Sequence, residues 1–177
     1  MKNKARISTL FWGVAMIVVV LFVGSASAQV PIVNYVHAGG PDLEDADVPG
    51  SEPGFDKNFS LLAFRYADGS ASGTLTDGYA GGGNLGLRAR IDCVHVVGNT
   101  AWVSGVVTRG RILDADGNPF DIAGYYVRTA VQDNGNGSDP SNPDKISFSA
   151  IRSTAPYVCR AMLGAFFDMP RGQVTVR

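Results

Sequence analysis

From residue 58 onward, apolar and polar side chains alternate in short runs, which is the period of a β-strand with one buried face. In the clearest run, 87–94, Leu, Ala, Ile and Cys alternate with Arg, Arg, Asp and Val. We therefore expect the first set, which ends with Cys93, to face the core. No stretch carries the 3.6-residue period of a long helix, and no segment repeats.

Gly98-Asn99 separates two of these runs and predicts a tight hairpin. Glycine at the first central position permits the positive φ of a type II′ turn. This turn fixes the pairing of the two strands. The expected partners are Val97 with Thr100, His95 with Trp102, Cys93 with Ser104, Ile91 with Val106 and Arg88 with Arg109.

Further strands are expected on both sides of this hairpin. Their predicted ranges are 59–66, 70–76, 120–132, 145–151 and 172–177. Asp68-Gly69 predicts a turn, and 80–84, 111–119 and 133–144 are expected to be connections. Within 120–132 we expect Tyr125, Val127, Thr129 and Val131 on one face, and within 145–151 we expect Ile146, Phe148 and Ala150 to point inward. Residues 160–167 predict either a helical turn or an apolar plug.

Seven or eight short strands, joined mostly by hairpins, predict an all-β protein. We expect an antiparallel up-and-down barrel, with a β-sandwich as the alternative. Closure of the barrel would remove exposed sheet edges.

The first 28 residues have a different pattern. Three basic residues precede an apolar run from Leu10 to Val23, and Ala26-x-Ala28 supplies the small residues that a signal peptidase requires. An uncleaved anchor is the alternative, but this run is shorter than the ~20 residues of a membrane span. We predict a signal peptide, 1–28, and a secreted protein, extracellular or periplasmic, with no membrane insertion after cleavage.

The signal peptide changes the charge balance. It holds three of the 15 basic residues and none of the 16 acidic ones, so its removal takes the net charge from −1 to −4. A mildly acidic chain lacks the basic surface of a nucleic-acid binder. Residues 29–57 carry six acidic residues and four prolines, which predicts a flexible acidic leader before a domain at 58–177. Within the leader, Val30–Val36 predicts at most one edge strand.

Export also affects how the two cysteines are interpreted, because disulfides persist in oxidising compartments. We predict a bond between Cys93 and Cys159, which would stabilise the fold by about 4 kcal/mol on the chain-entropy model. Two buried free thiols are the alternative.

Four segments of the chain resemble small exported bacterial β-domain proteins of uncharacterised function. They are an F-x-x-x-A-R-like strand at Phe59–Arg65, a C-x-x-V-x-G-N-x-A hairpin at Cys93–Gly105, a V-x-D-N-G loop at Val131–Gly135 and a terminal strand at Gly172–Val176. The resemblance extends over about 110 residues of the chain and implies a β-fold. It implies no catalytic residue.

Catalytic and metal-binding patterns are weak. His37 and His95 are too far apart for a zinc motif, and Gly69–Gly73 places alanine where a nucleophile elbow needs serine. Asp114–Asn118 departs from a calcium loop, and the oxygen-rich 133–144 predicts an ordinary turn-rich loop rather than a weak calcium site. We expect no catalytic residue, no cofactor and no metal.

One group of residues could bind a ligand. Its members are Arg88, Arg90, Trp102, Arg109, Tyr126 and Arg128. If their face lined a barrel interior, they would form a cationic pocket for a small polar or anionic ligand. If this face pointed outward, the arginine side chains would be solvated on the protein surface, which is the interpretation we favour.

Three functions are therefore open. The leading hypothesis is a non-enzymatic exported domain with a structural or binding role. The alternatives are a lipocalin-like barrel that binds a small molecule and a cofactor-free isomerase or cyclase.

Overall fold

The structure is a computed structural model that describes residues 29–43, 56–78, 85–137, 139–161, 164–169 and 172–177. These residues form eleven strands and no helix. The predicted signal peptide lies outside the described residues. The strands are β1 (Ile32–Leu43), β2 (Asp56–Tyr66), β3 (Ala71–Gly78), β4 (Gly86–Val97), β5 (Thr100–Leu113), β6 (Pro119–Asp121), β7 (Tyr126–Gln132), β8 (Lys145–Ile146), β9 (Ala150–Arg152), β10 (Phe167–Asp168) and β11 (Gln173–Val176).

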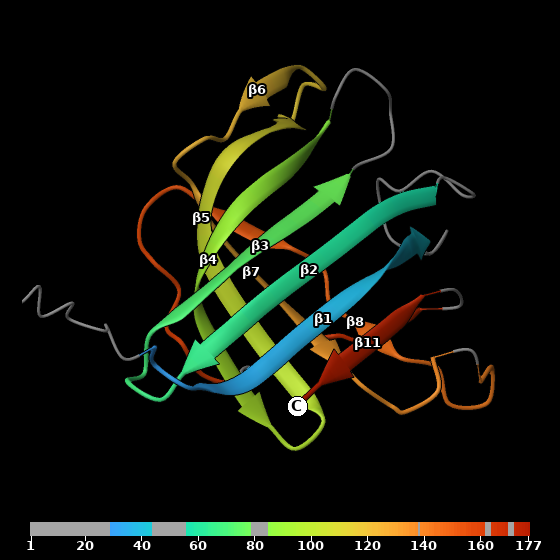
Figure 1. Cartoon of the computed structure of the whole chain (residues 1–177). Coiled ribbons are helices and arrows are strands. Elements are labelled where there is room, and N and C mark those ends of the chain that lie inside the picture. The colour runs from blue at the N-terminus through green and yellow to red at the C-terminus, as the bar shows by residue number, and fades with distance from the viewer. Residues whose placement is uncertain (1–28, 44–55, 79–84, 138, 162–163, 170–171) are drawn as a thin grey trace, which may run out of the picture.

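All eleven strands belong to one antiparallel sheet, as the alternating pattern predicts. Its main path runs β10-β8-β7-β5-β4-β3-β2-β1-β11, with β6 paired to β5 and β9 paired to β7. Successive strands from β1 to β5 are neighbours, which is an up-and-down order. The sheet curls like a barrel wall, with β1 to β3 in front of β7 and β8 in Figure 1.

The hairpin of β4 and β5 confirms most of the predicted pairs. Gly98 has a φ of +59°, and Val97, His95, Cys93 and Arg88 have their expected partners. Ile91 does not, because it pairs with Gly105 instead of Val106. Two compensating irregularities cause this: Asp92 is an extra residue in β4, and Thr108 is an extra residue in β5.

The extra residue at Asp92 reverses the phase of the alternation in β4. Ile91 and Val94 are in the core, whereas Cys93 pairs with Ser104 on the outer face. The prediction that Cys93 faces the core is therefore wrong. A strict alternation cannot reveal a bulge, because the sequence around it still reads as a continuous strand.

The sheet begins inside the segment predicted to be an acidic leader. Ile32–Leu43 forms β1, which lies between β2 and β11 and so is not an edge strand. Val36 and Ala38 are fully buried in the core. This stretch contains glycine and proline, so its own sequence only weakly favours a strand. Its pairing with β2 and β11 orders it. Residues 44–55 lie outside the described residues.

Two predicted strands are interrupted. The range 120–132 is divided into β6 and β7 by a turn at 122–125, in which Gly124 has a φ of +85°. The range 145–151 is divided into β8 and β9 by residues 147–149. Ile146 is buried as predicted, but Phe148 is 44% exposed because this interruption shifts the phase of the strand. The described part of 160–167 has no helical turn.

The concave side of the sheet is filled with apolar side chains. Each of the core members is at most 4% exposed, and burial of each larger aliphatic side chain contributes about 1.5–3 kcal/mol. They come from nearly every long strand and include Val36, Leu61, Leu75, Leu87, Ile91, Val103, Val107, Val127, Val131 and Val174.

The free edge of β11 is covered by side chains from the loop 133–144. The backbone N–H of Val174 donates to Asp144 (2.6 Å), and the N–H of Val176 donates to Asp133 (3.0 Å). β11 pairs with β1 through its other edge. The two carboxylates thus accept the N–H groups on the free edge of β11, which the carbonyl groups of a neighbouring strand would accept in a continuous sheet.

Candidate binding site

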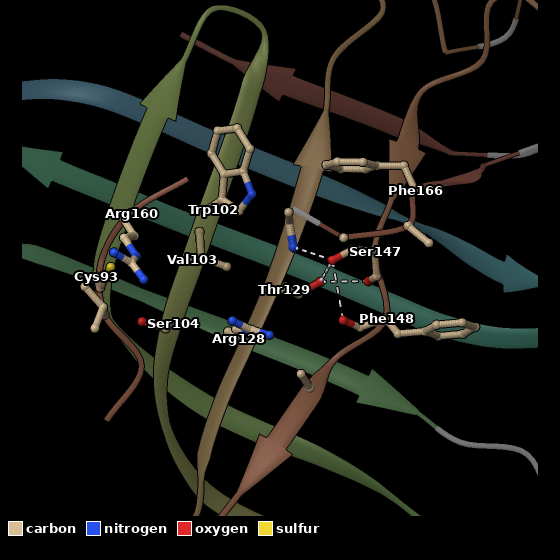
Figure 2. Close-up of a pocket in the computed structure, with 15 residues that line it drawn as sticks. Cys93, Trp102, Val103, Ser104, Arg128, Thr129, Ser147, Phe148, Arg160 and Phe166 are labelled. Atoms are coloured by element: carbon tan, nitrogen blue, oxygen red, sulfur yellow. Dashed lines mark hydrogen bonds between the residues drawn. The ribbon is translucent and has the colours of Figure 1, made fainter. Parts of the chain in front are cut away.

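A pocket of about 200 Å³ lies on the outer side of the sheet, against β5 and β7 (Figure 2). Its floor comes from the two strands, and its other walls come from residues 147–161 and 164–166, which we call the covering segment. The floor residues are Trp102, Val103, Ser104, Arg128, Thr129 and Ala130. The residues of the covering segment are Ser147, Phe148, Ala150, Val158, Arg160, Gly164, Ala165 and Phe166.

Strand alternation places the floor residues. Ala101 and Val103 point into the core, so Trp102 and Ser104 project to the outer face. Trp102 pairs with Ala130 and Ser104 pairs with Arg128 across the β5–β7 ladder. Trp102 also lies beside His95, with ring centroids 6.1 Å apart, which confirms that expected cross-strand pair.

The predicted disulfide ties the covering segment to the sheet. Cys93 on β4 is bonded to Cys159, with Cα atoms 5.6 Å apart. Cys93 lines the pocket, and Figure 2 shows Arg160 beside it. The bulge at Asp92 is what makes this bond possible, because it turns Cys93 outward toward the covering segment.

Stacked cationic and aromatic groups give the covering segment a second attachment. The guanidinium carbons of Arg128 and Arg152 lie 4.7 Å and 4.0 Å from the centroid of the Tyr157 ring. Arg152 also donates to the carbonyl oxygens of Ala155 and Pro156. The Tyr157 ring therefore contacts two cations, which the negative face of an aromatic ring attracts.

Hydrogen bonds fix the start of the covering segment against β7. The backbone N–H of Ala130 donates to the Ser147 hydroxyl (2.8 Å), and the Thr129 hydroxyl donates to the Ser147 carbonyl (2.9 Å). These bonds satisfy the β7 edge where β8 has ended and β9 has not begun. They also determine where Phe148 leaves the sheet. Phe148 contacts Phe167, and their ring centroids are 4.4 Å apart.

The charge in this pocket has one sign. Arg128 and Arg160 are the charged residues among those that line it, and none of the lining residues is acidic. Arginine is always protonated at physiological pH, so both groups are cations. The walls add the aromatic rings of Trp102, Phe148 and Phe166. The site thus offers cationic hydrogen-bond donors next to apolar surface.

The structure separates the predicted ligand-binding residues. Trp102 and Arg128 line the pocket, and Tyr126 is on β7 but not among the lining residues. Arg88 pairs with Arg109 on the exposed outer face, and Arg90, also exposed, forms a 3.4 Å ion pair with Asp92. These three arginines have the outward orientation that we favoured from the sequence. Arg88 and Arg109 border a second depression, which Asp77 and Asp121 also line.

Sequence reasoning missed the residues contributed by the covering segment. Arg160, Phe148 and Phe166 are far from the hairpin in sequence, and no periodic pattern places them beside it. The available signal was the cysteine pair, because a bond to Cys159 brings Arg160 to β4. That signal was obscured by the prediction that Cys93 faces inward.

The oxygen-rich turns have backbone partners. Asp144 accepts N–H groups from Asn134 (2.8 Å) and Val174 (2.6 Å), and Asp114 accepts those of Asp116 (2.9 Å) and Asn118 (2.8 Å). Such bonds are typical of Asx turns and loop closure. Among the described residues, no group of three or more His, Cys, Asp or Glu side chains could hold a metal ion.

Comparisons with known proteins found no relative. No family model, no curated protein and no solved structure matches the chain. In the part of the chain that the structure describes, no helix is long and apolar enough to cross a membrane.

Proposed function

We propose that this protein is an exported, non-enzymatic binding domain that holds a small molecule in the pocket between the outer face of β5 and β7 and the C-terminal segment. The observation that carries the proposal is the pocket itself, about 200 Å³ in volume and walled by a segment fastened through the Cys93–Cys159 bond.

The size of the pocket supports a binding role over a purely structural one. Its volume of about 200 Å³ exceeds that of a cavity of about 150 Å³ that holds benzene, so it has room for a small ligand. A segment that only covered the sheet could pack directly on Trp102 and Ala130. Here it is fixed at Ser147 and Cys159 and leaves room between these points.

The position of the pocket changes the lipocalin-like hypothesis. A lipocalin-like barrel would hold its ligand on the concave side of the sheet, where this chain has packed aliphatic side chains such as Leu75 and Val103. A ligand of this protein would instead bind on the convex side. The small volume favours a molecule with one ring or a short chain rather than a long lipid.

Export is supported by the basic and apolar pattern of residues 1–28 and by the disulfide. Native mass spectrometry of the protein recovered from the exporting cell tests the binding role. We expect a retained small molecule that dissociates on unfolding.

A variant that fills the pocket makes this test specific. Ala130→Phe adds a ring to the floor beside Trp102 and should abolish ligand retention, whereas Ala123→Phe, at an exposed turn, should leave it unchanged. Retention that is equal in both variants would place the ligand elsewhere. If no molecule is retained and none from a fragment library perturbs Trp102, the binding role is wrong.

A further inference from the structure

We infer that the outer-face pocket selects a small organic anion, with a carboxylate or similar head group on a single-ring or short apolar body. This inference rests on the proposed binding function and specifies its ligand.

The head group follows from the charges of the pocket. Arg128 from β7 and Arg160 from the covering segment line the same space, and no acidic residue lines it with them. Two cations that share a small pocket repel each other, and an anion between them is attracted to both. A guanidinium has five N–H donors in a planar fork, which fits the two oxygens of a carboxylate.

Stacking gives one of these cations a fixed direction. The guanidinium carbon of Arg128 lies over the Tyr157 ring, 4.7 Å from the ring centroid, and this contact restricts the side chain. Figure 2 shows the Arg128 side chain projecting from β7 between Ser104 and Phe148. A head group at this point would be held by a donor that has already lost much of its rotational freedom.

The body follows from the walls and the volume. Trp102 and Phe166 supply aromatic surface, and Val158, 64% exposed, lies at the outer margin. A cavity of about 150 Å³ is known to hold benzene, so about 200 Å³ fits one ring with a short substituent. Phenylacetate has this composition: one ring, one methylene group and one carboxylate.

Tryptophan fluorescence gives a direct measurement. Trp12 lies within residues 1–28, so a chain of residues 29–177, which contains every described residue, has Trp102 as its single tryptophan. Phenylacetate, its neutral analogue phenylacetamide and inorganic sulfate would each be titrated against this chain. We expect phenylacetate to bind at least tenfold more tightly than phenylacetamide, and sulfate, which lacks the apolar body, to bind more weakly than phenylacetate.

Arginine variants assign the preference to the pocket. Arg160→Gln should remove most of the preference for phenylacetate over phenylacetamide, and Arg160→Lys, which keeps the charge, should retain part of it. Arg128→Gln should act in the same direction, but Arg128 also stacks on Tyr157, so Arg160→Gln decides the outcome. Arg90→Gln, on the exposed face of β4 outside the pocket, is the matched control and should change nothing.

The outcomes separate this inference from the proposed function. Equal affinity for phenylacetate and phenylacetamide, with both abolished by Ala130→Phe, would overturn the anion preference and leave the binding role intact. A preference that survives Arg160→Gln in the folded variant would also overturn it. If neither compound alters Trp102 fluorescence or the thermal midpoint and native mass spectrometry finds no retained molecule, both the inference and the proposed function are wrong.

Discussion

The Asp144 carboxylate accepts the backbone N–H of Val174 at 2.6 Å, across thirty residues of sequence. Its second oxygen accepts the N–H of Asn134 at 2.8 Å, and its own carbonyl accepts the N–H of Met169. Asp144 is fully buried. One side chain therefore connects the loop after β7 to the last strand, and it does so as a buried acceptor of two donors.

Asp144→Asn should lower the free energy of unfolding by about 2–4 kcal/mol, because it weakens two buried hydrogen bonds to a charged group. An amide has one acceptor oxygen, so its NH₂ group would face the N–H of either Val174 or Asn134. Urea denaturation measures the change. Asp116→Asn, in an exposed turn, should leave the midpoint unchanged. Equal midpoints for the two variants would contradict a role for Asp144 in closing the sheet.

The sequence predicted a loop at 133–144 but not its role. Asn, Gly, Asp and Pro residues indicate turns because each favours local backbone conformations. Asp144 is buried because β11 packs beside it. The residues next to Asp144 in the sequence do not indicate this contact, since β11 is about thirty residues away. The same limit applies to β1, where residues 32–43 gain their order from pairing with β2 and β11.

Gly105→Ala should destabilise the protein by about 3 kcal/mol or more, because a Cβ there has no room. It would lie 1.9 Å from the carbonyl oxygen of Arg90 and 2.8 Å from Cα of Ile91, so β5 would have to move away from β4. Gly39→Ala is the matched control in another strand, where the nearest atom is 3.6 Å away. Thermal unfolding of both variants distinguishes the positions, and similar midpoints would contradict the close approach.

The close approach of Gly105 to the backbone of Arg90 marks the point at which the predicted pairing of β4 and β5 fails. The turn at Gly98 fixes the pairs nearest to it, and those pairs are confirmed as far as Cys93 and Ser104. Beyond them Asp92 is inserted, and the close approach at Gly105 accompanies the shift. An alternating sequence is compatible with either register until the packing of β3 and β7 selects one.

Ser70→Ala should raise the pKa of Asp68 toward its usual value of 3.8. The Ser70 hydroxyl (2.6 Å) and its backbone N–H (2.9 Å) donate to the Asp68 carboxylate and hold this pKa below that value. A lowered pKa in the folded state adds stability above the pKa of the unfolded chain, and that stability is lost as the pH falls through the folded value. The variant should therefore lose less stability than the wild type on acidification.

Carboxyl carbon NMR titration measures this pKa directly. Asp139 provides an internal control, because the Ser141 hydroxyl (2.7 Å) and N–H (2.9 Å) lower its pKa in the same way. Ser70→Ala should shift Asp68 alone, and Ser141→Ala should shift Asp139 alone. An unchanged Asp68 titration in Ser70→Ala would show that the hydroxyl bond has no influence on the carboxylate.

Reduction of the Cys93–Cys159 bond should lower the free energy of unfolding by about 4 kcal/mol on the chain-entropy model, since the bond spans 66 residues. It should also weaken ligand binding, because Arg160 and Val158 are adjacent to Cys159 and line the pocket. The double variant Cys93→Ser, Cys159→Ser should reproduce both effects and be insensitive to reductant. Urea denaturation and Trp102 fluorescence, each with and without reductant, measure the two effects separately.

Two outcomes would contradict this account in different ways. Alkylation of both thiols in the denatured, unreduced protein would show that the bond is not formed. Loss of stability on reduction with unchanged ligand affinity would show that the contacts of Ser147 with β7 and the stacking of Tyr157 hold the covering segment without the disulfide. The bond would then stabilise the fold, and the geometry of the pocket would depend on the hydrogen bonds and ring contacts alone.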